Sequence, residues 1–228
     1  MRGKLLVLVC ILMVSILTGC TSVNKRLAEK SETVEYYRIF DIKTKADRFT
    51  VAKAAMEGLT KNVGSAKQEM PIPSFSEPPE KPGRFKIVNT LEGTKIATLL
   101  AAQGSALQLK TALCPDAVWI GRAVKEVEDW WTLKLTACLF QYKDGYHLDM
   151  YAIFTKHSGG INIAKALGKA IASKAVGSPE EWVEKVFADI VRTIYEKTQA
   201  EITFVEGYPP VTGTPWLDKG DSVYKKQQ

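Results

Sequence analysis

Histidine and cysteine are scarce in this chain of 228 residues, which contains two histidines and four cysteines. His147 and His157 have no second histidine or Cys-x-x-Cys pair at the spacing that most zinc sites use. Neither has a partner pattern for activating a nucleophile, so both are expected on the surface or in a loop. The sequence therefore predicts no metal site and no cofactor.

Short catalytic motifs are also missing. The chain has no Gly-x-Ser-x-Gly elbow, Ser-x-x-Lys, His-Glu-x-x-His or phosphate-binding glycine loop. The carboxylate pair Glu180-Glu181 is explained by a helix N-terminus, where negative charge is favourable. We therefore expect a protein that is not an enzyme.

No block of one charge sign stands out. The formal net charge is +6 at pH 7, and acidic residues are interleaved with basic ones along the chain. Nucleic-acid and heparin surfaces need denser clusters of Lys and Arg. No nucleic-acid partner is expected.

The apolar run near the start is too short to span a membrane. It extends from Leu5 to Leu17, about 13 residues, whereas a spanning helix needs ~20. Basic residues precede it and small residues follow it, which is typical of a signal peptide. Residues 1–19 are predicted to be that signal.

The end of this signal, Leu17-Thr18-Gly19-Cys20, resembles the lipobox of bacterial lipoproteins. The resemblance implies cleavage between Gly19 and Cys20, a diacylglycerol on the Cys20 thiol and an N-acyl chain, such as palmitate, on its amino group. Several acyl chains are enough for stable anchoring. Thr21 follows the cysteine, and in this family that favours the outer membrane, with the domain facing the periplasm. An ordinary secretory signal and an uncleaved membrane anchor are the alternatives.

Two cysteines, Cys114 and Cys138, then remain in an oxidising compartment that permits a disulfide. If the turn between their strands lies near 128–129, Cys138 faces about Trp119. Cys114 would then lie five extended residues away, or roughly 16–18 Å, whereas a disulfide needs Cα atoms within ~7 Å. The register opposes a simple disulfide, and the pairing stays open.

Periodicity predicts a strand over 34–42 that is covered on both faces, and a helix from Asp47 to about Val63. Five prolines over 65–84 exclude regular structure there, so a surface loop is expected, with a polyproline recognition segment as the alternative. A strand over 85–88 and an interrupted helix over 94–113 follow.

The clearest signal is a hairpin over 131–154. Asp144-Gly145 predicts a type I′ turn, which pairs Leu139 with Met150 and brings the apolar side chains to one face. With a strand over 117–127 it forms a three-strand meander. The other face carries Lys134 and Asp149, which argues against a lipid-facing hairpin. That face is expected to be partly covered by helices.

Two helices are expected after the hairpin. Residues 161–176 form a small basic amphipathic helix that could rest on a membrane or pack in an oligomer, unless it docks on its own domain. Its polar stripe makes Lys165, Lys169 and Ser173 candidate contact residues. Ser178 and Glu181 form a capping box at the start of the last helix, and a short strand over 202–205 follows it.

Together these elements predict an α/β (α+β) fold in the order β-α-β-α-β-β-β-α-α, with helices on a mixed sheet. One domain is expected over 34–204, between a tether over 20–33 and an extended tail over 205–228. The stretch Pro115-Asp116-Ala117-Val118-Trp119-Ile120-Gly121-Arg122-Ala123-Val124 resembles the third strand of two envelope families. These are the curli-secretion lipoproteins and the amino-terminal domain of the Tol-system propeller protein. The resemblance implies a domain used in envelope assembly or transport.

The sequence thus predicts a non-catalytic outer-membrane lipoprotein whose periplasmic domain binds an envelope protein or oligomerises. The expected contact regions are the basic helix, the proline loop over 70–82 and the C-terminal tail. One alternative is an oligomeric transport or secretion component that inserts residues 157–176 into a bilayer. The other is a periplasmic hydrolase.

Overall fold

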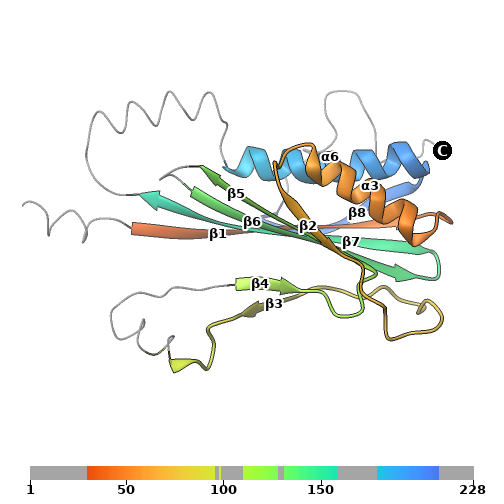
Figure 1. The fold of residues 1–228 in the computed structure, drawn as a ribbon, viewed down its shortest axis with the longest axis horizontal. Coiled ribbons are helices and arrows are strands. Elements are labelled where there is room, and N and C mark those ends of the chain that lie inside the picture. Colours follow the sequence, from red (N-terminus) through yellow and green to blue (C-terminus); the bar gives the residue numbers. More distant parts are fainter. Residues whose placement is uncertain (1–29, 96–97, 99–109, 128–130, 159–178, 211–228) are drawn as a thin grey trace, which may run out of the picture.

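The computed structural model describes residues 30–95, 98, 110–127, 131–158 and 179–210 (Figure 1). These residues form an α+β fold, which confirms the predicted class. The elements are β1 (Lys30–Lys43), α3 (Arg48–Thr60), β2 (Ala66–Glu69), β3 (Lys86–Asn89), β4 (Lys110–Leu113), β5 (Trp119–Val127), β6 (Trp131–Tyr142), β7 (Gly145–Ser158), α6 (Pro179–Thr198) and β8 (Glu201–Tyr208).

Six strands form one sheet in the order β2-β5-β6-β7-β1-β8, and β3 and β4 form a separate two-stranded sheet. The expected meander is present as β5-β6-β7. All pairings among the described strands are antiparallel, so the mixed sheet of the prediction is an antiparallel one. β1 begins at Lys30 and β8 continues to Tyr208. Both strands extend beyond the expected limits of 34 and 205.

The fold has three layers (Figure 1), with α3 and α6 on one face of the large sheet and the β3-β4 hairpin on the other. The helix-covered face holds the main core, where strand residues such as Phe40, Leu135 and Leu148 meet Val186 and Ile190 of α6. Both described helices pack on this face. Among the described residues, the hairpin and the proline segment cover the opposite face, where the sequence predicts partial cover by helices.

Residues 70–85, which contain the five prolines, connect β2 to the β3-β4 hairpin on the second face of the sheet. We call this segment the strap. The backbone N–H of Lys143 donates to Pro79 O (3.0 Å), which fixes the strap at the β6-β7 turn. Further along, the backbone N–H of Phe85 donates to Asp149 Oδ2 (3.0 Å). The strap therefore wraps around one end of the sheet and then follows its second face.

Two short strands differ from the sequence prediction. β2 lies within the expected loop, because the first proline is Pro71 and the four residues of β2 are free to pair with β5. β4 lies within the expected helix over 94–113 and pairs with β3. Ala112 is buried there against Tyr151 and Ile153, so tertiary pairing overrides a weak helical preference. Residues 99–109 of that expected helix lie outside the described residues.

The hairpin turn is one residue earlier than predicted. Tyr142 pairs with Gly145 and Leu139 pairs with Leu148, so Lys143 and Asp144 form the loop. Among the described non-glycine residues, positive φ angles occur at Asp116 and Gln199, so this is not a type I′ turn. Gly145 has φ +152°, and a Cβ there would lie 2.0 Å from Ile42 O. The glycine is needed for the close approach of β1, and the apolar side chains still share one face.

Cys114 and Cys138 form a disulfide, with their Cα atoms 6.2 Å apart. The structure differs from the expected register in two respects. Cys138 pairs with Ile120, and the chain between Cys114 and β5 is a turn, in which Ala117 N donates to Cys114 O (3.3 Å). Asp116 takes φ +61° in this turn. The turn folds Cys114 back over β6, so the five residues do not extend away from it.

Candidate functional site

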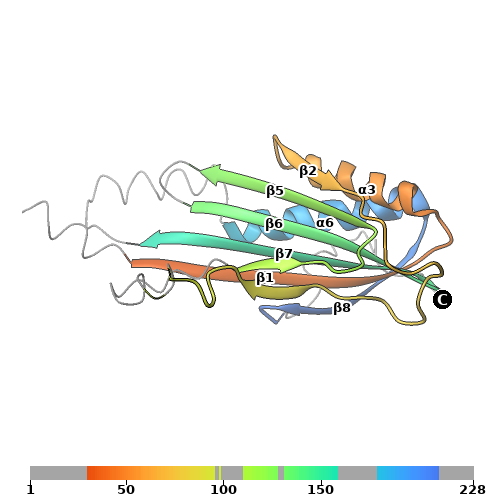
Figure 2. The same ribbon diagram turned by 60° about the horizontal axis from the view of Figure 1, so that its bottom comes forward.

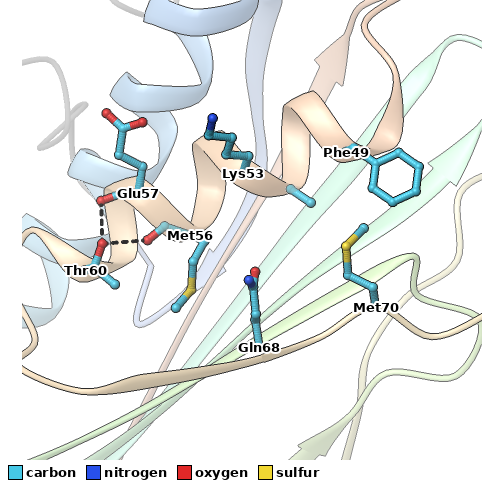
Figure 3. Close-up of a pocket in the computed structure, with 8 residues that line it drawn as sticks. Phe49, Lys53, Met56, Glu57, Thr60, Gln68 and Met70 are labelled. Atoms are coloured by element: carbon cyan, nitrogen blue, oxygen red, sulfur yellow. Dashed lines mark hydrogen bonds between the residues drawn. The ribbon is translucent and has the colours of Figure 1, made fainter.

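Figure 2 shows β2 at the edge of the large sheet, next to β5. A hollow lies between α3 and β2 (Figure 3). It is a groove of about 480 Å³, within the range typical of ligand pockets. Figure 3 shows Phe49 and Met70 facing each other at one end and Met56 pointing into it. The groove is lined by Phe49, Ala52, Lys53, Met56, Glu57, Thr60, Gln68 and Met70.

The N-terminus of α3 is held by a cap that sets where Phe49 projects. Asp47 Oδ1 accepts from the backbone N–H groups of Phe49 (2.9 Å) and Thr50 (3.2 Å), and the Thr50 hydroxyl donates to Asp47 Oδ2 (2.7 Å). These hydrogen bonds, that of the Thr50 hydroxyl first, lower the pKa of Asp47. A capped helix holds the wall of the groove in one position.

The groove is apolar within and polar at its rim. Phe49 is 58% exposed and Met70 is 39% exposed, so two large apolar side chains at one end of the groove are open to solvent. Gln68 forms part of its floor and accepts a hydrogen bond from Trp119 Nε1 (3.0 Å). Glu57 lies within ion-pair distance of Lys197 (3.4 Å). This composition suits an apolar or amphipathic segment, and the flexible methionines can adapt to its shape.

β2 adds backbone hydrogen-bonding capacity beside the groove. It is a terminal strand of the six-stranded sheet and pairs with β5 on one side. Alternate residues of a terminal antiparallel strand direct their N–H and C=O groups away from the sheet. An extended peptide can pair with such an edge while its side chains enter an adjacent groove. The arrangement therefore fits the binding of an extended segment.

A polar cluster lies on the opposite face, beneath the strap. Tyr142 donates to Asp41 (2.6 Å). His147 Nε2 lies 3.9 Å from Asp41 Oδ1, and His147 Nδ1 lies 3.9 Å from Asp149 Oδ1. Neither His147 Nδ1 nor Asp149 Oδ1 has a hydrogen-bond partner among the described residues. The prediction of a surface or loop position for His147 is wrong, because it lies in β7 with a side chain that is 17% exposed.

Burial dominates the electrostatics of this cluster. Asp149 is 1% exposed, and burial raises its pKa to about 7, against which the hydrogen bond from Phe85 N–H acts. Burial also lowers the pKa of His147, and Asp41 opposes that change. Both shifts favour the neutral forms of the two side chains. The cluster is closed by the strap, so it is less open to a partner than the groove.

The residues predicted for lipidation, cleavage and membrane contact lie outside the described residues. These are Gly19, Cys20, Lys165, Lys169 and Ser173. In the described part of the chain, no helix is long and apolar enough to cross a membrane. The same part holds no group of three or more His, Cys, Asp or Glu side chains arranged as metal ligands.

The groove was not predicted from the sequence, because it depends on β2. Once β2 is placed beside α3, two apolar residues of the helix indicate the groove. Phe49 in the first turn of the helix is exposed, and Met56 near its middle is only partly buried. No family model matches the chain, and no curated protein has a significantly similar sequence.

Proposed function

We propose that the protein is a non-catalytic outer-membrane lipoprotein whose periplasmic α+β domain binds an extended segment of an envelope protein. The lipobox-like stretch that ends at Cys20 supports the anchor. The Cys114–Cys138 disulfide supports an exported domain, because disulfides persist in oxidising compartments.

The observation that carries the binding role is the apolar groove beside β2, whose outer edge pairs with no other described strand. Phe49 and Met70 are exposed at its entrance, and the partner segment would pair with β2 while apolar side chains enter between α3 and the strand. Lys53 and Glu57, which also line the groove, would favour a segment with polar flanks. Because a lipid anchor confines the domain to the same membrane as its partner, a modest affinity is sufficient.

The test is photo-cross-linking in intact cells, with a photoreactive amino acid at Met70 of the full-length protein. We expect cross-linking to one segment of one envelope protein, located by mass spectrometry. The matched control position is Val124, which is 53% exposed on β5, outside the groove. A cross-link at Val124 with none at Met70, Phe49 or Met56 would contradict the binding role.

The anchor is tested in the same cells with Cys20→Ala. This variant should lose incorporation of labelled palmitate and leave the outer-membrane fraction, and its cross-linking at Met70 should fall because the domain is no longer confined. Cys10→Ala, a change within the signal, is the control and should retain the label. If Cys20→Ala keeps both processing and membrane retention, the lipoprotein assignment is wrong, whatever the groove binds.

A further inference from the structure

A smaller cavity lies on the other side of the large sheet, where the β3-β4 hairpin covers it. Its volume is about 210 Å³. Two lysines, three threonines and Tyr151 line it, and Ile153 provides an apolar wall. It is separate from the groove, because its walls come from β4, β6 and β7 and from Thr90 at the end of β3.

The lining of this cavity is rich in hydrogen-bond donors. Lys110 in β4 and Lys134 in β6 provide ammonium groups, and Thr111 and Thr136 provide hydroxyls. No carboxylate is among the described residues that line it. Each ammonium carries three donors and no acceptor, so the lining has more donors than acceptors. Such a site favours a ligand rich in acceptors.

One nearby carboxylate offsets part of the positive charge. Glu35 Oε1 lies 2.5 Å from Lys110 Nζ, and the Tyr151 hydroxyl donates to Glu35 Oε2 (3.0 Å). Glu35 therefore fixes the direction of Lys110 and balances its charge. Among the described residues, Lys134 has no carboxylate within 4.0 Å, so the cavity keeps one uncompensated positive charge.

The floor of the cavity is shielded from water. Thr136 is 7% exposed, Tyr151 is 2% exposed and Ile153 is 9% exposed. The Thr136 hydroxyl has no hydrogen-bond partner among the described residues, so it is available to a ligand. Electrostatic attraction is stronger near such a buried surface than in bulk water. Paired strands also hold the backbone of Lys110, Thr111, Lys134 and Thr136 in fixed positions.

We propose that this cavity binds a small oxyanion, a phosphate or carboxylate group, through the ammonium groups of Lys134 and Lys110 and the hydroxyls of Thr136 and Thr111. The volume accommodates one such group with a short substituent. A lysine ammonium binds phosphate as a point charge, and hydroxyls complete the hydrogen bonds to the remaining oxygens. The site does not depend on the function proposed for the groove.

The test is equilibrium dialysis of labelled inorganic phosphate, and separately of acetate, against the full-length protein in a maltoside detergent, which contains no phosphate. We expect saturable binding of at least one of the two anions, with one site per chain. Lys134→Met should weaken it about tenfold, as expected for the loss of a charge-assisted hydrogen bond. Thr136→Val, which keeps the side-chain volume, should also weaken it.

Lys86→Met is the matched control, because it removes the same charge from β3, where Lys86 is exposed and does not line the cavity. This variant should bind the anion as the unmodified protein does. Circular dichroism verifies that each variant is folded. If neither anion binds saturably, or if Lys86→Met weakens binding as much as Lys134→Met does, the proposal is overturned and the effect is one of general surface charge.

Discussion

At the scale of single residues, Asp149 is a buried carboxylic acid on the second face of the sheet whose ionisation is unfavourable. It is 1% exposed, and one of its oxygens has no partner among the described residues. The titratable and charged groups on the elements packed around it are Asp41, Arg84, Tyr142, His147 and Glu206. Since burial raises its pKa to about 7, the folded protein holds Asp149 as the neutral acid over most of the acidic range.

Asp149→Asn should therefore change how stability depends on pH. The folded pKa of Asp149 is raised from 3.8 to about 7, so its contribution to stability is fully present below pH ~4 and is lost as the pH rises through 7. This difference in pKa corresponds to a change of at most about 4 kcal/mol in the free energy of unfolding. Urea unfolding at pH 5 and pH 8 should show the variant gaining stability relative to the wild type at pH 8.

The comparison isolates Asp149 because His147 is present in both proteins. Burial lowers the pKa of His147, so its contribution has the opposite sign and is lost as the pH falls below 6.5. Asp144→Asn, which changes an exposed carboxylate in the β6-β7 turn, is the control and should keep the wild-type dependence. The interpretation is wrong if Asp149→Asn has the same pH dependence as the wild type.

At the scale of elements, the close packing of α3 against α6 depends on Gly58. An added Cβ at Gly58 would lie 2.5 Å from Ile190 Cα and 2.6 Å from Asp189 O, which are backbone positions of α6. A side-chain rotation cannot relieve such a contact. Gly58 therefore allows α3 and α6 to approach closely, and α3 is also one wall of the groove.

Gly58→Ala should destabilise the fold although alanine is the better helix former. Overpacking against α6 should lower the free energy of unfolding by about 1–3 kcal/mol. This loss outweighs the gain of about 1 kcal/mol that comes from the higher helix propensity of alanine. Because α3 must move, binding of a partner segment in the groove should weaken as well. Chemical denaturation measures the loss of stability.

Gly64→Ala is a suitable comparison because a Cβ at Gly64 would meet nothing within 4 Å. Gly64→Ala should leave the free energy of unfolding unchanged or raise it by about 0.4–1 kcal/mol, because alanine leaves the unfolded chain fewer conformations than glycine does. Equal stabilities for the two variants would mean that the close helix contact is unimportant.

The elements that could be predicted from the sequence are those with long, regular periodicity. α3, α6 and the β5-β6-β7 meander were predicted because their apolar residues repeat over many positions. β2 and β4 have four residues each, too few for a period, and only pairing with β5 and β3 defines them. The sequence does not predict the groove or the Gly58 contact, and it leaves the disulfide open, since each depends on which elements become neighbours.

At the scale of the whole molecule, β1 joins parts of the chain that are distant in sequence. It pairs with β7 on one side and with β8 on the other. Arg38 extends this link on the helix side of β1. Its Nη1 donates to the carbonyl oxygens of Tyr37 (2.8 Å), Tyr208 (2.9 Å) and Pro209 (3.2 Å), and its Nη2 pairs with Glu184 of α6. One 3% exposed guanidinium therefore joins β1, β8 and α6.

Arg38→Met should consequently destabilise the domain as a unit, by about 3–5 kcal/mol, because it leaves a partly buried Glu184 and three carbonyl groups without their donor. The same substitution at Arg122, whose ion pair with Glu69 is exposed, should cost no more than about 1 kcal/mol. Urea unfolding followed by both circular dichroism and tryptophan fluorescence is the measurement. Because β1 links β7, β8 and α6, the two signals should shift together to lower urea concentration. If fluorescence and circular dichroism separate into two transitions, β8 and α6 unfold independently and Arg38 is only a local contact.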